Sequence, residues 1–228
     1  MNTSNNIILI TGGCSGSGLR IARSLAEKGN TVIITGCCKS RLADAAGYHK
    51  NIVPLHFDVT SEKGLESLIA ELRANFSELN VFINNAGQDY AASEAYELSP
   101  CEQRFASGYL SGIQITEELL PMLSHQEKSA IIDLSLVTLQ ENGISRTAGT
   151  VRNAVASYFD MLRFALKKVS NVTLFDLQLL GLDDRSKSET ITKRISAMFN
   201  EEAPRADGSY AKPYFYHDAH FSILSLSN

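Results

Sequence analysis

Short apolar runs alternate along the chain with longer segments whose apolar residues recur at helical spacing. Residues 7–10 and 31–35 are almost wholly apolar or β-branched, as expected of strands that are buried on both faces. Between them, residues 19–26 carry apolar side chains three and four positions apart, and Gly29-Asn30 is a typical helix end. This part of the chain is therefore predicted to form a strand, a helix and a second strand.

The same alternation predicts strands at 52–57, 80–83, 130–134 and 172–177, and helices at 65–76, 100–123 and 151–169. Buried strands separated by helices favour a parallel sheet covered on both faces. Because 228 residues suffice for one well-buried core, we predict a single-domain, Rossmann-type, doubly wound α/β fold with three α/β/α layers. The pattern weakens in the divergent C-terminal region, residues 183–228.

A glycine-rich turn joins the first predicted strand to the first predicted helix. Its sequence is Thr11-Gly12-Gly13-Cys14-Ser15-Gly16-Ser17-Gly18. Glycines at this place let backbone amides approach a pyrophosphate, and the helix N-terminus favours the anion. A tight turn that holds no ligand is the alternative interpretation of such a motif.

Three motifs in order resemble those of the short-chain dehydrogenase/reductase (SDR) family. The glycine-rich turn matches its TGxxxGxG loop, Asp58 its acidic residue after the third strand, and Asn84-Asn85-Ala86-Gly87 its NNAG segment. The resemblance covers roughly residues 5–182, and residues 79–87 are most similar to the DltE-like oxidoreductases of the family. It implies a Rossmann fold and an NAD(P)-dependent oxidoreductase.

The resemblance also implies which residues hold the dinucleotide. Gly12, Gly16 and Gly18, with Ser15 and Ser17 in the same turn, would surround the pyrophosphate. The adenine and adenosine side would be lined by Asp58, Val59, Asn85, Ala86 and Gly87. For Asn84, a ligand role and a structural role in tying neighbouring strands together are both open.

The choice between NAD and NADP is read at the end of the second strand, where an acid would hold the ribose diol and an arginine the extra phosphate. This chain has Gly36-Cys37-Cys38-Lys39 there, so neither residue is in place. Lys39 or Arg41 would supply positive charge nearby, which tilts the expectation slightly toward NADP. A solvated surface charge is an equally good interpretation of either side chain.

The family's catalytic residues are expected to be missing. Members use a tyrosine as general acid or base, a lysine four residues later that lowers its pKa, a serine that orients the substrate, and an asparagine in a proton relay. Matching the motifs places Gly149 at the tyrosine, Asn153 at the lysine, Leu136 at the serine, and Gly108, or Tyr109 with a one-residue slip, at the asparagine. Neither Gly149 nor Asn153 can perform the corresponding step.

Three functions therefore remain open, of which the third is a purely structural subunit that no longer binds nucleotide. The first is a pseudoenzyme with a binding, scaffolding or regulatory role and a possibly retained dinucleotide site. The second is an NAD(P)-dependent oxidoreductase or a non-redox biosynthetic enzyme that uses other residues, such as Ser135, Thr138 or Thr150. Arg146, Arg152, Gln88 and Gln140 would lie near the substrate cleft, where they bind an anion or solvate the rim.

Charge and hydropathy limit the partners. The net charge is −4 and the basic residues are scattered, so neither nucleic acid nor a membrane is expected as a partner. No leader or membrane-spanning run is visible, and we expect a cytoplasmic protein with a small-molecule or protein partner. The helix at 151–169 is more apolar than one buried face requires, and the resemblance implies a homodimer formed through it.

Cysteine and histidine spacing gives little sign of a metal site or a disulfide. The four cysteines are too few and too irregular for a framework, and a bond between adjacent Cys37 and Cys38 would be strained, so reduced thiols are expected. His217 and His220 lack further ligands in a recognisable pattern, so we predict no metal. Aromatic residues 210–216 would form an edge strand or pack over the cleft.

Overall fold

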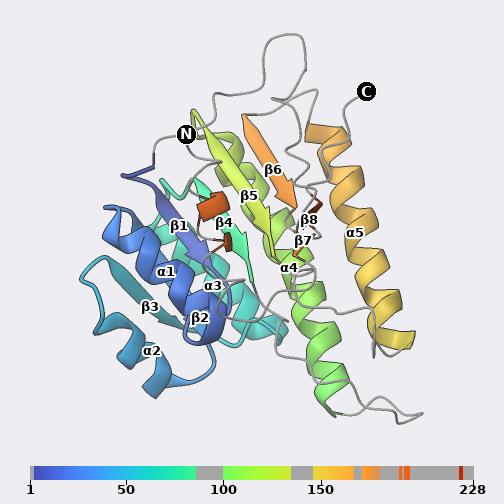
Figure 1. Ribbon diagram of the computed structural model, residues 1–228, viewed down its shortest axis with the longest axis horizontal. Helices are drawn as coiled ribbons and strands as arrows, with labels where there is room; N and C mark the ends of the chain where they lie inside the picture. The colour runs from blue at the N-terminus through green and yellow to red at the C-terminus, as the bar shows by residue number, and fades with distance from the viewer. Residues whose placement is uncertain are drawn as a thin grey trace.

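The computed structural model describes residues 3–85, 100–134, 146–166, 171–176, 178–179, 190–191, 193–195 and 221–222. Six parallel strands form one sheet in the order β3-β2-β1-β4-β5-β6 (Figure 1). In chain order they are β1 (Ile7–Ile10), β2 (Thr31–Gly36), β3 (Ile52–His56), β4 (Val81–Asn84), β5 (Ser129–Asp133) and β6 (Val172–Asp176). The parallel Rossmann-type sheet predicted from the sequence is confirmed.

Five helices connect these strands. They are α1 (Gly16–Glu27), α2 (Lys39–Ala46), α3 (Glu62–Asn75), α4 (Pro100–Ser124) and α5 (Arg146–Leu166). A short antiparallel pair, β7 (Gln178–Leu179) with β8 (Phe221–Ser222), stands apart from the main sheet. Within the described part of the chain, no helix is both long enough and apolar enough to cross a membrane.

Alternate residues of each strand face two separate hydrophobic layers. Ile8, Ile10 and Ile83 belong to the layer covered by α1 and α2, whereas Leu9 and Phe82 belong to the layer covered by α3, α4 and α5. All five side chains are fully buried. Both faces of the sheet are therefore covered, which explains why its strands are continuous apolar runs.

The glycine at the end of α1 fixes the return of the chain into β2. Gly29 adopts φ +84°, a left-handed conformation that glycine accepts readily. Its amide donates to the carbonyl of Ala26 at 2.9 Å, and the next amide, of Asn30, donates to Leu25 at 3.4 Å. This is the Schellman arrangement, and it confirms the helix end predicted from Gly29-Asn30.

The helix α2 and a contribution of the C-terminal region to the core were missing from the sequence prediction. Only Leu42 and Ala45 of α2 are buried, too few to show helical periodicity. Ile191 and Ile195 lie in short helical segments and are fully buried in the layer that contains α1. The aromatic stretch at 210–216 lies outside the described residues.

Candidate functional site

Polar residues end the central strands at one edge of the sheet. Thr11 follows β1 directly, and Asn84 and Asp133 are the paired last residues of β4 and β5. All three side chains are fully buried. The carboxyl ends of parallel strands, at the point where the strand order reverses between β1 and β4, are where open α/β sheets bind ligands.

Asn84 ties three strands together at this edge. Its Nδ2 donates to Oδ1 of Asp133 at 2.8 Å, and its Oδ1 accepts from the Thr11 hydroxyl at 3.3 Å. From α4, Gly112 packs directly on the Asn84 side chain, so a β-carbon at residue 112 would collide with it. These contacts are those expected of a structural role for Asn84, in which it ties neighbouring strands together.

Asn85 holds the glycine-rich turn in place. Its Nδ2 donates to the carbonyls of Thr11 at 3.1 Å and Gly12 at 3.2 Å, while its own amide donates to the Thr11 hydroxyl at 3.0 Å. Its Oδ1 accepts from the Ser17 hydroxyl at 3.4 Å. The Asn85 side chain is therefore hydrogen-bonded to the turn and holds it in position.

Glycines shape the backbone of the turn. Gly12 and Gly16 adopt φ +66° and +55°, and Gly16, at the start of α1, is exposed with nothing within 4 Å of the place a β-carbon would take. Gly18 is buried, and a β-carbon there would stand 2.5 Å from the Gly12 carbonyl oxygen. Since the first turn of α1 contains no acidic residue, the dipole of this helix favours an anion there.

The predicted adenine contacts lie at the end of β3. Asp58 is exposed, and its Oδ1 accepts from the amide of Thr60 at 3.0 Å and from its hydroxyl at 2.6 Å. Val59 is buried in the layer that contains α3. Lys39 is exposed at the first position of α2, whereas Ala86 and Gly87 lie outside the described residues.

Of the positions matched to catalytic residues, Gly108, Gly149 and Asn153 lie in described helices. Gly108 is buried in α4, and Gly149 and Asn153 are one helical turn apart in α5, where Asn153 is exposed. Leu136 lies outside the described residues. The same holds for the other candidates Ser135, Thr138, Gln88, Gln140, His217 and His220.

Tyr158 is engaged away from this edge of the sheet. Its hydroxyl donates to Oε1 of Glu117 at 2.7 Å and so links α5 to α4. Partial burial, and then the Glu117 carboxylate, raise the pKa of Tyr158 well above its ordinary value. A phenol that is held protonated in this way is a poor general base at neutral pH.

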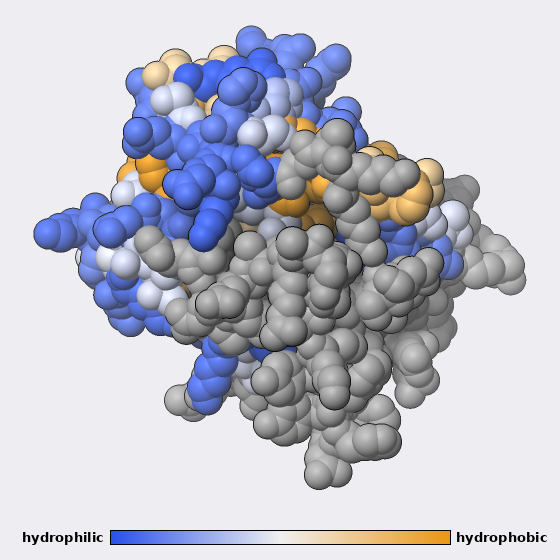
Figure 2. Space-filling model, turned by 90° about the horizontal axis from the view of Figure 1, so that it is seen from above, coloured by the Kyte–Doolittle hydropathy of each residue, from blue (hydrophilic) through white to orange (hydrophobic). Residues whose placement is uncertain are grey.

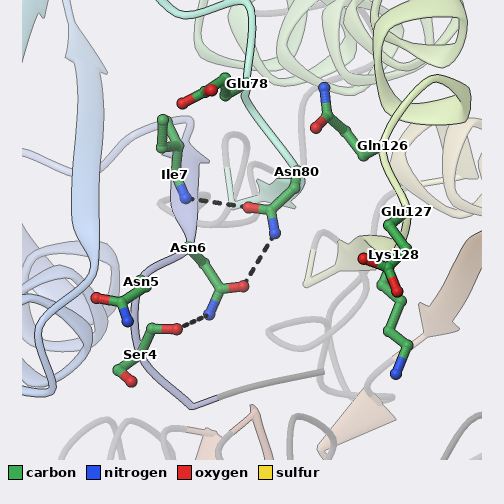
Figure 3. A pocket seen from close by; sticks show the side chains of 9 residues that line it. All are labelled: Ser4, Asn5, Asn6, Ile7, Glu78, Asn80, Gln126, Glu127 and Lys128. Atoms are coloured by element: carbon green, nitrogen blue, oxygen red, sulfur yellow. Dashed lines mark hydrogen bonds between the residues drawn. The ribbon is translucent and has the colours of Figure 1, made fainter.

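A polar hollow of about 370 Å³ lies at the opposite edge, where the strands begin (Figure 3). Asn80 lines it, and both atoms of its side-chain amide are hydrogen-bonded within the protein. Oδ1 accepts from the amide of Ile7 at 3.0 Å, and Nδ2 donates to Oδ1 of Asn6 at 3.0 Å. Seen from this side, the described surface is largely hydrophilic (Figure 2). These contacts give the hollow a structural explanation, since they secure the amino ends of β1 and β4.

The contact between Gly112 and Asn84 predicts a sharp difference between two glycines. Gly112→Ala forces a methyl group into the buried Asn84 amide and should lower the free energy of unfolding by about 1–3 kcal/mol. Gly47→Ala, at an exposed helix end with φ −63°, should change it by less than about 0.5 kcal/mol. Chemical denaturation measures both; equal effects would show that α4 does not press on Asn84.

A model of the family described as short chain dehydrogenase matches residues 6–174. The oxidoreductase DltE of Bacillus subtilis is 33% identical over 141 residues, which cover 59% of this chain and 55% of that protein. Serine 3-dehydrogenase of Agrobacterium fabrum is 35% identical over 133 residues, covering 57% and 53%. The chain thus matches little more than half the length of these curated relatives.

Solved structures of the same fold are also similar. Serine dehydrogenase from Escherichia coli has a TM-score of 0.71 at 23% identity, covering 83% of this chain and 90% of that one. The 3-ketoacyl-(acyl-carrier-protein) reductase from Brucella melitensis, complexed with NADH, has a TM-score of 0.66 at 19% identity, covering 78% and 77%. With the family model, the sheet order and the glycine-rich turn in agreement, the chain belongs to the short-chain dehydrogenase family.

Proposed function

We propose that this chain is a nucleotide-binding pseudoenzyme: it holds a dinucleotide by the adenosine half and lacks the residues for hydride transfer. The observation that carries the proposal is the glycine-rich turn, fixed by Asn85 and open at Gly16, on a chain that has Gly149 and Asn153 at the positions matched to tyrosine and lysine. A binding, scaffolding or regulatory role follows from such a combination.

The turn fits a pyrophosphate by its own geometry. Space is open where a side chain at Gly16 would stand, and the backbone amides of the first turn of α1 lie behind it. Gly12 takes up a conformation that brings the backbone round without a side chain in the way. In other members of the family a bound nicotinamide dinucleotide supplies or accepts the hydride; here these residues would bind and orient its phosphates.

NADP is favoured over NAD by the charges around the end of β2. Lys39 is exposed at the start of α2, and Arg41 is exposed two residues later in the same helix. No acidic residue occupies Gly36-Cys37-Cys38 to hold a ribose diol. L-sorbose reductase from Gluconobacter frateurii, a structural neighbour with a TM-score of 0.61, is complexed with NADPH.

The catalytic half of the proposal rests on side-chain chemistry. Glycine at 149 carries no proton to transfer, and the neutral amide of Asn153 cannot depress a neighbouring pKa as an ammonium does. Tyr158, the tyrosine of α5, is committed to Glu117. Because loss of a general acid alone typically costs about two to four orders of magnitude in rate, ordinary carbonyl reduction is expected to be absent.

Calorimetric titration with NADPH and NADH tests the nucleotide site. We expect micromolar binding of NADPH, weakened at least about tenfold in Gly16→Val because the added side chain fills the open space over the turn. Gly29→Val is the matched control: it places the same side chain on a left-handed glycine outside the site and should bind as the parent does. Equal losses in both variants, or no binding by the parent chain, would contradict the proposal.

A homodimer is proposed to form through the outer side of α5. Met161 and Phe164 are 71% and 63% exposed there, a large apolar surface for a helix that packs on a sheet. Phe164→Glu should shift the chain from dimer to monomer in sedimentation analysis because a charge would be buried in the interface. Tyr48→Glu, at an exposed aromatic residue beyond α2, should leave the dimer intact; a monomeric parent would refute the proposal.

A further inference from the structure

Three of the four cysteines gather beside the glycine-rich turn. Cys14 lies in the turn, and Cys37 and Cys38 follow β2 immediately. The Cys14 side chain packs on Gly36, since a β-carbon at residue 36 would come 2.8 Å from Sγ of Cys14 and 3.4 Å from its Cβ. The missing side chain at Gly36 thus makes room for a thiol between the turn and the end of β2.

The thiols of Cys14 and Cys38 differ in reactivity. Sγ of Cys38 lies 3.3 Å from the Ser40 hydroxyl, which, with the backbone amides of Arg41 and Ser40, lowers the pKa of this thiol. Burial raises the pKa of the Cys14 thiol. Because the thiolate is the nucleophile, Cys38 is expected to react first at neutral pH and Cys14 to remain a thiol.

The geometry favours Cys14 over Cys37 as the partner of Cys38. A bond between the adjacent residues Cys37 and Cys38 would be strained. Cys37 is exposed, and its carbonyl is held toward β3 by Nε2 of His56 at 3.0 Å. Cys14 contacts Gly36, two residues before Cys38.

We propose that Cys38 is a hydroperoxide-reactive modification site and that Cys14 is its resolving thiol, so that oxidation closes a disulfide across the mouth of the nucleotide site. The disulfide itself is independent of the proposed function, whereas its effect on nucleotide binding rests on that function. Oxidation would tie the turn to the end of β2, where the ribose of a dinucleotide approaches.

The hydroperoxide is the oxidant in this reaction. The Cys38 thiolate attacks the hydroperoxide, the O–O bond breaks, and an S–O bond forms as the alcohol, or water from hydrogen peroxide, departs. The sulfur gives two electrons to the peroxide and is thereby oxidised to the sulfenic acid. Cys14 then loses its proton and attacks that sulfur; the S–S bond forms as the S–O bond breaks and the oxygen leaves as water. A dithiol reduces the disulfide back to two thiols.

Peptide mapping of the full chain after hydrogen peroxide treatment tests the pairing. We expect a Cys14–Cys38 cross-linked peptide that dithiothreitol abolishes, its persistence in Cys37→Ser, and its loss in Cys38→Ser. In Cys14→Ser, a dimedone adduct should accumulate at Cys38 because the sulfenic acid is no longer resolved. A cross-link that contains Cys37 in place of Cys38, or oxidation confined to Cys14, would overturn the inference.

Calorimetry on the same samples tests the consequence. Oxidised parent chain should bind NADPH at least about tenfold more weakly than the reduced chain and recover with dithiothreitol, whereas Cys38→Ser should show no response to peroxide. Equal affinity of the cross-linked and reduced chains would overturn the regulatory role. If the reduced chain itself failed to bind, the proposed function would fall, while the peptide map would still decide the thiol chemistry.

Discussion

The buried hydrogen bonds at the carboxyl ends of β1, β4 and β5 are the constraint on which the candidate site depends. Asn84 joins Thr11 to Asp133, and Asn85 takes hold of the carbonyls of the glycine-rich turn. Buried amides are costly unless their bonds are made, so each of these contacts fixes the position of its neighbours. The conformation of the turn therefore depends on Asn85, directly after β4, as well as on its own glycines.

The adenosine side and the nicotinamide side of the site depend on different features of the chain. The adenosine side depends on the glycine-rich turn and on the tight contacts of Gly18 with Gly12 and Asn85, all of which the chain has kept. In the proposed function, the side that would hold the nicotinamide depends on side chains that transfer protons, and the chain has Gly149 and Asn153 at the positions matched to two of them. Binding and chemistry can thus diverge, because the first relies on backbone geometry and the second on specific side chains.

The fold is predictable from the sequence where one physical signal dominates. Continuous apolar runs gave β1, β2 and β4 almost to the residue, because strands buried on both faces leave few alternatives. Helix α2, whose eight residues bury only two side chains, was not predicted. The hydrogen bonds from the Asn85 side chain to the turn were not predicted either. The burial of Ile191 and Ile195 was missed as well, since contacts between distant segments leave only a four-residue spacing in the sequence.

A pseudoenzyme would bind NADPH without passing its hydride to a carbonyl compound, and isotope labelling detects that transfer. The protein would be incubated with NADPH carrying deuterium on the transferring face, together with a panel of aldehydes, ketones and 3-ketoacyl thioesters, and the alcohols analysed for deuterium by mass spectrometry. We expect no deuterated alcohol above a protein-free control. Catalytic amounts of deuterated product that disappear in Gly16→Val would contradict this expectation and reveal an enzyme that works with other residues.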